Sequence, residues 1–325
     1  PPSPPTGSQT QTTRLAPSPT GALHLGNART FLVNWALARQ RNWRILLRIE
    51  DLDSPRVKPG VIDLTIDLLA WLGIDWDDGP FIQSSDLTHH LVAMHTLAQR
   101  GFIYPSHLTR AQIEASASAP QEGAHELAFP SSLRPPTLPT AFTDDAPSWR
   151  LATPDVDVTF TDAFAGAQRV RPAATIGDFV VFTRRDPAAP GQPAYQLAVV
   201  VDDHRWHVTQ VIRGDDLLDS AARQLLLYRA LSFAPEPTYT HLPLVKGGDG
   251  RRLAKRHGDT RLDTFRTRGV PVERVVGLIA YWCGLAAARV PLSPQEFRGA
   301  FDLRTMSKEP VVYGAEDEAW LLRGK

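Results

Sequence analysis

Two loops, one rich in glycine and proline and the other in glycine and arginine, lie far apart in the chain and constrain its fold. The first, residues 14–27, reads RLAPSPTGALHLGN, and the second, residues 250–258, reads GRRLAKRHG. Each loop is a weak signal by itself. Their order, and their positions on either side of strand-rich segments, make the pair more informative than either loop alone.

The first loop lies inside a strand–loop–helix–strand pattern. Residues 14–16 are a short strand candidate, and residues 26–41 place Phe31 and Trp35 at helical spacing. Residues 44–51 then form a continuous apolar run, which suits a parallel strand buried on both faces. This order predicts a right-handed βαβ unit whose loop lies at the carboxyl ends of the strands, where open α/β sheets bind ligands.

Further elements follow from apolar periodicity and capping residues. Residues 194–203 form an apolar run ending in Asp202 and Asp203, which we interpret as a buried strand whose carboxyl end faces a site. Asp219 or Ser220 is expected to cap a helix that carries Leu225, Leu226 and Tyr228. The remaining predictions are a strand over residues 208–213 and helices over residues 61–72, 272–285 and 294–301.

Composition limits the class of protein. Lys+Arg and Asp+Glu number 35 each, so the formal net charge is zero, which argues against a nucleic-acid binder that relies on a bulk positive field. A single cysteine, Cys283, excludes an intrachain disulfide and a cysteine-cluster metal site. No apolar run reaches the ~18 residues of a membrane span, and the N-terminus lacks signal-peptide features. We therefore expect a cytoplasmic protein without membrane contact, and a monomer.

The first loop has the chemistry of an anion site at a helix N-terminus. Gly21 and Gly26 have P-loop spacing, but Asn27 stands where a P-loop needs lysine, and the chain has no G-x-G-x-x-G. What remains is a loop that enters a helix, whose backbone amides and dipole attract an anion. His24 and Asn27 can present donors on one side, and Gly26 permits close approach of a nucleotide. The alternative is a turn with a capping asparagine and a solvent-facing histidine.

Together, the two loops resemble the HIGH and KMSKS motifs of class I aminoacyl-tRNA synthetases. Asn27 takes the fourth HIGH position, while Arg252 and Ala254 replace the first lysine and the serine of KMSKS, and Lys255 keeps the second lysine. The motif R-x-E-D-x-D at residues 48–53, and residues 194–203 and 211–216, resemble the glutamyl-tRNA synthetases in particular.

The resemblance implies a Rossmann-like class I synthetase catalytic domain. Residues 104–174 are rich in proline and poor in periodicity, so we expect an inserted α+β lobe there. The lobe would split the catalytic domain into residues 13–103 and 175–245. A disordered tail, residues 1–12, would precede it, and the KMSKS-like loop with a small α-helical region, residues 246–325, would follow it.

The resemblance also implies which residues bind substrates. ATP, with Mg²⁺, would be handled by His24, Gly26, Asn27, Arg252 and Lys255, of which His24, Asn27 and Lys255 would be catalytic. Glutamate would be bound by Arg14, Leu15, Ala16, Pro17, Ser18, Glu50, Tyr195 and Arg213. The physical chemistry agrees, because glutamate has two carboxylates for arginines and one ammonium for a carboxylate.

Simpler interpretations of the charged residues stay open. Glu50, Asp51 and Asp53 could form an acidic turn or helix cap, and Arg213 could pair with Asp215 or Asp216. A paired-carboxylate hydrolase is a weak alternative for the acidic cluster, because no nucleophile motif accompanies it.

Only about 70 residues follow the second loop, fewer than an anticodon-binding region needs, so the chain resembles the short paralogues, the glutamyl-Q tRNA(Asp) synthetases. These attach glutamate to queuosine in the anticodon of tRNA(Asp), which implies L-glutamate, ATP and that tRNA as partners. The alternatives are a truncated glutamyl-tRNA synthetase acting on tRNA(Glu) and a non-catalytic relative that binds RNA or an amino acid.

The short paralogues usually hold zinc through Cys-x-Cys and Tyr-x-x-x-Cys in the inserted lobe. This chain has Ser106 and Leu108 at the first pair, and Phe129 and Leu133 at the second. Because leucine cannot ligate a metal and tetrahedral zinc needs about four donors, we predict no structural zinc. His107 and His125 could ligate a metal, although surface histidines are the favoured interpretation.

Overall fold

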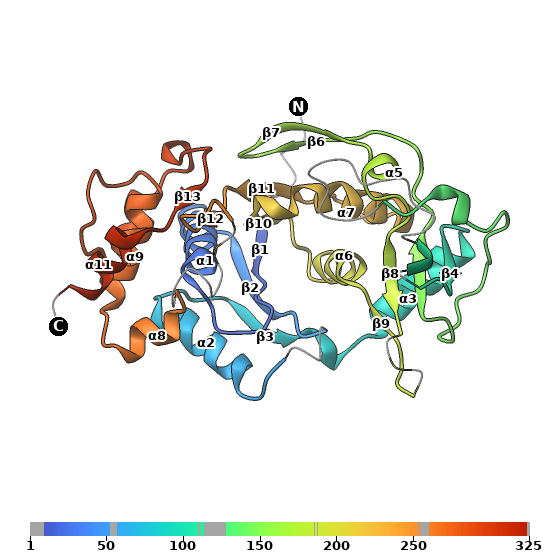
Figure 1. The fold of residues 1–325 in the computed structure, drawn as a ribbon, viewed down its shortest axis with the longest axis horizontal. Coiled ribbons are helices and arrows are strands. Elements are labelled where there is room, and N and C mark those ends of the chain that lie inside the picture. The colour runs from blue at the N-terminus through green and yellow to red at the C-terminus, as the bar shows by residue number, and fades with distance from the viewer. Residues whose placement is uncertain are drawn as a thin grey trace, which may run out of the picture.

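The computed structural model describes residues 10–52, 57–109, 111–113, 128–184, 186, 188–251, 253 and 260–323. Its centre is a parallel sheet with the strand order β11-β10-β1-β2-β3 (Figure 1). These strands are β1 (Thr12–Leu15), β2 (Arg44–Ile49), β3 (Asp78–Ile82), β10 (Gln210–Gly214) and β11 (Thr238–Leu242). The chain moves outward from β1 to β3 and later returns on the other side of β1. The strand order therefore reverses between β1 and β10, where open α/β sheets bind ligands.

Both faces of this sheet are covered. Helix α1 (Leu25–Gln40) lies on one side of it, and α6 (Tyr195–Arg205) lies on the other (Figure 1). The side chains of β2 alternate between two hydrophobic cores, with Ile45 and Leu47 in one and Leu46 in the other. This burial on both faces confirms the strand predicted over residues 44–51.

The other predicted helices are confirmed with small shifts at their ends. They are α2 (Val61–Trp71), α9 (Val272–Trp282) and α10 (Pro294–Ala300). The remaining helices are α3 (Thr88–Gln99), α5 (Pro172–Thr175), α7 (Leu218–Leu231), α8 (Leu262–Thr267) and α11 (Ala315–Leu322). A short parallel pair, β12 (Val245–Lys246) and β13 (Val311–Val312), ties the C-terminal helices to the segment after β11. No helix in the described ranges is long and apolar enough to span a membrane.

The region where we expect an inserted lobe contains an antiparallel sheet with the order β4-β5-β8-β9. Its strands are β4 (Ile103–Ser106), β5 (Ser148–Leu151), β8 (Val180–Thr183) and β9 (Gln192–Pro193). Strands β8 and β9 follow residue 174, so this sheet extends past the boundary expected there.

A hairpin within the same insert reaches back to the central sheet. It consists of β6 (Val158–Asp162) and β7 (Gly166–Val170) and lies over β11 and α7 (Figure 1). In its turn, the backbone N–H of Ala163 donates to the carbonyl of Tyr239, at 2.8 Å. The hairpin turn therefore contacts β11, an edge strand of the central sheet.

The predicted strand over residues 194–203 is wrong, because this segment forms the helix α6. Every residue from Gln196 to Asp203 is buried, so the apolar run carries no amphipathic period that would distinguish a helix from a strand. The valines at 199–201 favour a strand by propensity. Packing against α3, α7 and β8 overrides that preference, because a helix satisfies its own backbone hydrogen bonds between two sheets.

The predicted cap of the following helix is also wrong. Helix α7 begins at Leu218, after a 3₁₀ turn over Asp215–Leu217, and its N-cap Leu217 makes no side-chain capping bond. Asp219 lies inside the first helical turn. Ser220 is buried, and its hydroxyl accepts a hydrogen bond from Gln196 at 3.0 Å. The 3₁₀ turn leads directly into the helix, so neither residue occupies the cap position.

Candidate active site

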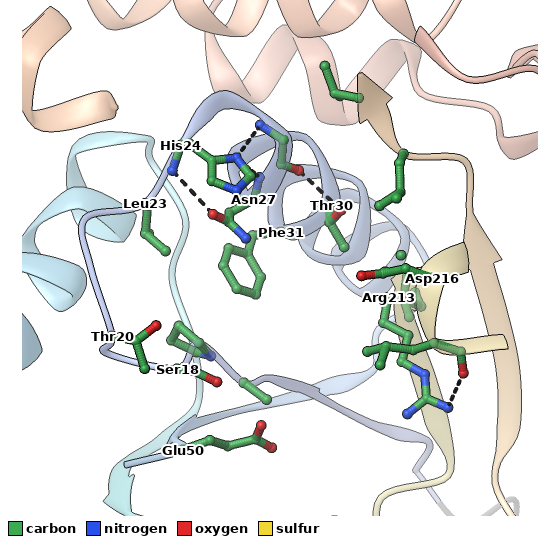
Figure 2. A pocket seen from close by; sticks show the side chains of 18 of the residues that line it. Ser18, Thr20, Leu23, His24, Asn27, Thr30, Phe31, Glu50, Arg213 and Asp216 are labelled. Carbon is green, nitrogen blue, oxygen red and sulfur yellow. Dashed lines mark hydrogen bonds between the residues drawn. The ribbon is translucent and has the colours of Figure 1, made fainter. Parts of the chain in front are cut away.

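A cavity of about 620 Å³ lies at the carboxyl ends of β1, β2 and β10, beside the N-terminus of α1 (Figure 2). The residues of the predicted site that line it are Arg14, Ala16, Pro17, Ser18, His24, Gly26, Asn27, Glu50, Tyr195 and Arg213. Leu15 is fully buried in the core instead. Successive side chains of a strand point to opposite faces, so Arg14 and Leu15 cannot both face the cavity.

His24 is the N-cap of α1. Its Nδ1 accepts hydrogen bonds from the backbone N–H groups of Gly26 and Asn27, at 3.1 and 3.3 Å. The Asn27 side chain returns the interaction by accepting from the His24 backbone N–H at 3.2 Å, which completes a capping box (Figure 2). Because Nδ1 accepts, the ring proton of the neutral imidazole lies on Nε2, which is therefore a donor.

Gly26 has a structural role in this cap. A Cβ at that position would lie 2.9 Å from Cε1 and 3.0 Å from Nδ1 of His24. The imidazole therefore occupies the space that any other side chain would need. Glycine at position 26 thus allows the histidine cap to form, in addition to the close approach of a nucleotide that we expect from the sequence.

A chain of buried charges joins Arg14 to Glu50. The Nη1 of Arg48 donates to Asp203 at 2.7 Å, and its Nη2 donates to Oε1 of Glu50 at 2.8 Å. The other oxygen of Asp203 lies 3.4 Å from Nε of Arg14. Burial opposes the charge of Arg48, but Asp203, Glu50 and Asp202 more than offset this and raise the pKa of Arg48. The guanidinium stays charged and links the two carboxylates.

Among the described residues, the groups that hold Arg213 are neutral. Its Nε donates to Nε2 of His241 at 2.9 Å, its Nη1 to Oε1 of Gln224 at 2.9 Å, and its Nη2 to the carbonyl of Leu217 at 3.2 Å. The guanidinium also lies over the ring of Tyr239, 5.1 Å from its centroid. Salt bridging to Asp215 or Asp216 is thus unnecessary to explain the position of this arginine.

Comparison with known proteins now identifies the family. The pattern described as "tRNA synthetases class I (E and Q), catalytic domain" matches residues 11–316. The chain belongs to this family. It is 46% identical to the "Glutamyl-Q tRNA(Asp) synthetase" of Symbiobacterium thermophilum, over 96% of the chain and 98% of the relative.

Two other relatives set the range of the similarity. The chain is 40% identical to the "Glutamate--tRNA ligase" of Parasynechococcus marenigrum, over 81% of the chain but 56% of the relative. The glutamate-tRNA synthetase structure from Elizabethkingia anophelis superimposes with a TM-score of 0.77 at 26% identity, covering 96% of this chain and 70% of that one. The class I synthetase fold expected from the sequence is confirmed.

The second synthetase motif lies mostly outside the described residues, which exclude Arg252, Ala254 and Lys255. Its described neighbours lie at the first motif. The backbone N–H of Leu253 donates to the carbonyl of Val245, which lines the cavity, and the N–H of Leu25 donates to the carbonyl of Thr260. His24 also forms a β-bridge with Arg261. The chain therefore enters and leaves residues 254–259 beside the first motif.

The acidic motif after β2 divides into two parts. Glu50 lines the cavity, whereas both oxygens of Asp51 accept from Ser84, at 2.8 Å from its backbone N–H and 2.5 Å from its hydroxyl. Asp51 thus ties the end of β2 to the 3₁₀ turn over Gln83–Ser85 that follows β3. Asp53 lies outside the described residues.

The described part of the chain contains no group of three or more histidine, cysteine or acidic residues that could hold a metal ion. His107 is exposed, and His125 lies outside the described residues. Ser106 and Phe129, which stand at positions of the expected zinc motif, are both buried.

Sequence reasoning missed the residues that hold the pocket arginines, namely Asp203, Gln224 and His241. A strand over residues 194–203 does not predict the contact of Asp203 with Arg14 and Arg48 that the helix α6 makes possible. His241 begins the His-Leu-Pro-Leu stretch before the second loop. Its position opposite Arg213 on the neighbouring strand could have been inferred once β10 and β11 were paired.

Proposed function

We propose that this protein activates L-glutamate with ATP and transfers the glutamyl group to queuosine in the anticodon of tRNA(Asp). The observation that carries the proposal is the convergence of Arg14, Glu50 and Arg213 on one cavity from the ends of three parallel strands. The name of the Symbiobacterium thermophilum relative, which matches over nearly its whole length, supports the tRNA and the modified base.

The charges of the cavity suit glutamate. Arg213 uses three of the five N–H donors of a guanidinium on acceptors in the described part of the chain, so two are left for a carboxylate. Both hydrogen bonds recorded there from Arg48 to Glu50 end on Oε1, which leaves Oε2 for the substrate ammonium. In this proposal Arg14 binds the second carboxylate, and Tyr195 with Ala16, Pro17 and Ser18 completes the wall.

The N-terminus of α1 suits the phosphates of ATP. The helix dipole, the donor Nε2 of His24 and the Asn27 amide face an anion more favourably than a neutral group. Arg252 and Lys255 are proposed to contact the leaving pyrophosphate from the second motif. Mg²⁺ would arrive bound to the ATP phosphates and supply charge neutralisation, a mode that needs few protein ligands.

The proposed reaction has two steps. An oxygen of the α-carboxylate of glutamate attacks the α-phosphorus of ATP, pyrophosphate leaves, and glutamyl-adenylate forms. A queuosine hydroxyl then attacks the acyl carbon, its proton is lost, and AMP leaves. No covalent enzyme intermediate is needed, so the protein contributes positioning and charge stabilisation through His24, Asn27 and Lys255.

The role of Lys255 has a direct test. Lys255→Ala should lower the rate of glutamate-dependent ATP–pyrophosphate exchange far more than it weakens glutamate binding, because pyrophosphate gains charge as it leaves. Lys308→Ala, which removes an exposed lysine outside the cavity, is the matched control and should leave both unchanged. Equal losses of rate and glutamate affinity in the Lys255 variant would remove this residue from the catalytic group.

A second candidate is a glutamyl-tRNA synthetase that charges tRNA(Glu), favoured by the identity to the Parasynechococcus marenigrum ligase. The weakness of this candidate is that the chain spans only 56% of that relative.

The deciding experiment incubates the protein with labelled glutamate and ATP, and measures transfer of the label to tRNA(Asp) with queuosine, to tRNA(Asp) without it, and to tRNA(Glu). Labelling of only the first supports the modification enzyme, and labelling of tRNA(Glu) supports the second candidate. No labelling by folded protein would favour a binding protein.

A cytoplasmic monomer is part of the same proposal. Its catalytic domain would consist of the segments before β4 and after β9, with the inserted lobe between them.

A further inference from the structure

We infer that Asp162 and His241 are positioning residues for Arg213, and that the insert hairpin thereby controls the shape of the amino-acid pocket. Neither side chain lines the cavity. Both are fully or almost fully buried. Asp162 comes from β6 of the hairpin, and His241 comes from β11 of the catalytic sheet.

The partners of His241 decide which of its ring nitrogens carries the proton. A guanidinium keeps its protons in proteins, so the 2.9 Å contact between Nε of Arg213 and Nε2 of His241 requires a lone pair on Nε2. The ring proton must then lie on Nδ1. That nitrogen is 2.7 Å from Oδ2 of Asp162, which can only accept when ionised. The three groups therefore form a directed series in which Arg213 donates to His241 and His241 donates to Asp162.

The surroundings of Asp162 keep its carboxylate ionised. Burial opposes ionisation, but the histidine and the backbone N–H groups of Ala165, Phe164 and His241 all donate to this carboxylate, and together they lower its pKa. An ionised Asp162 holds His241 in the Nδ1–H form. The pKa of His241 is itself lowered, by burial and by the nearby Arg213, against the opposing effects of Asp162 and of the Leu217 backbone. The ring is thus neutral and has one tautomer that fits.

These contacts fix the orientation of the Arg213 guanidinium. Its Nη1 is fixed by Gln224, whose own amide donates to Gln196 at 3.0 Å. With Nε fixed by His241, the planar fork has a single orientation, and the donors left over are aimed as a unit. Loss of either acceptor would let the fork turn, so the hairpin contact matters for binding a carboxylate even though it is remote from the cavity.

The test uses Asp162→Asn, a change of almost equal size. The asparagine can place its NH₂ opposite Nδ1, which favours the Nε2–H tautomer of His241 and turns a donor toward Nε of Arg213. We expect the KM for glutamate to rise roughly 10- to 100-fold, as for partners that orient ligating histidines, while the KM for ATP stays within about twofold. Asp157→Asn is the matched control, because Asp157 pairs with Arg169 beside the same hairpin and does not contact His241.

A second variant separates positioning from folding. In a His241→Gln protein, the amide oxygen can accept from Arg213 whether or not residue 162 is charged. Asp162→Asn should therefore have little effect in the His241→Gln background and a large effect in the wild-type background. Equal effects of Asp162→Asn in both backgrounds would overturn the inference.

The kinetic part of this inference rests on the proposed function, so a readout independent of activity is included. In ¹⁵N-histidine-labelled protein, the His241 signal, assigned by its loss in His241→Gln, should show the Nδ1–H tautomer in the wild type and the Nε2–H tautomer in Asp162→Asn. An Nε2–H tautomer in the wild type would overturn the positioning role even if glutamate is activated. The expected tautomers without any glutamate-dependent exchange would contradict the proposed function and leave the series of hydrogen bonds established.

Discussion

The two walls of the cavity hold their arginines in different ways. On the β1–β2 wall, Arg14 and Arg48 share Asp203, and Arg48 also binds Glu50. On the β10 wall, Arg213 donates to an imidazole, an amide and a carbonyl, and lies over an aromatic ring. Both walls bury positive charge, but among the described residues only the first places carboxylates of the protein in direct contact with its arginines.

This difference assigns different work to the two walls. Carboxylate-held arginines form a rigid ionic frame, since removing one member leaves an uncompensated buried charge. Neutral acceptors fix the direction of Arg213 without cancelling its charge, so the attraction for a substrate carboxylate is kept. The β1–β2 wall should therefore dominate stability, and the β10 wall should dominate affinity for glutamate.

Replacing Arg48 should have the largest effect. Arg48→Met keeps an unbranched apolar stem but removes the guanidinium, so that among the described side chains Asp203 keeps only the longer contact to Arg14 and Glu50 loses its partner. We expect a loss of about 3–5 kcal/mol in the free energy of unfolding, the usual cost of breaking a buried ion pair. Urea titration measures it. A loss below about 1 kcal/mol, the level of an exposed pair, would contradict the ionic frame.

Replacing Arg213 should affect binding more than stability. Arg213→Ala leaves neutral acceptors unpaired, which costs less than an orphaned charge. Affinity for glutamate should fall by about 2–5 kcal/mol, the usual cost of truncating a buried charged partner, as measured by calorimetry.

Arg14→Ala, the counterpart of Arg213→Ala on the other wall, should abolish glutamate selectivity and also lower stability, because Asp203 loses a partner. Unchanged glutamate affinity in either variant would remove that arginine from the pocket.

The elements that could be predicted from the sequence are those with a local signal. The apolar run of β2 and the periodicity of α1 gave the βαβ unit, and the strand ends then indicated where Arg14 and Glu50 should meet. Arg213 ends the strand predicted over residues 208–213, and the resemblance to glutamyl-tRNA synthetases implied its role. In each case, one short segment contains both the structural pattern and the functional side chain.

The elements that could not be predicted depend on contacts between distant segments. Helix α6 is buried all around, so its sequence lacks the period that would identify a helix. The contact between Asp162 and His241 joins residues 79 positions apart. No spacing in the sequence indicates that the hairpin turn would dock on β11. The support of the pocket is therefore less predictable than its lining.

A third test of the comparison uses pH, because the β10 wall contains a titratable group. The groups facing His241 are Asp162, Arg213 and Tyr239. The pKa of His241 in the folded state is lowered from 6.5. Below about pH 6.5, the histidine is therefore protonated in the unfolded state while it stays neutral in the folded state. The contribution of His241 to stability is thus complete above that pH and is lost as the pH falls through the interval down to the folded pKa.

Unfolding free energies of the wild type and His241→Gln, compared at roughly pH 7.5 and roughly pH 5.5, isolate this contribution. The wild type should lose more stability on acidification than the variant. The pKa of His204 is also lowered, by burial and by His207, but that effect is common to both proteins and cancels. The lowered pKa of Asp162 acts below its ordinary value of 3.8, outside this interval. Parallel losses in the two proteins would mean that His241 carries a proton in the folded state.

The smallest expected effect lies at the end of α1, between the two walls. Gly26→Ala would place a methyl group against the His24 ring, forcing the ring to leave its cap. We expect a loss of about 1 kcal/mol in stability, the usual value of an N-cap, and a severalfold higher KM for ATP with unchanged glutamate affinity. Gly21→Ala is the matched control, because a Cβ there meets nothing within 4 Å. If both substitutions raise the KM for ATP equally, the effect belongs to loop stiffness. If only Gly26→Ala does, the histidine cap itself prepares the helix end for phosphate.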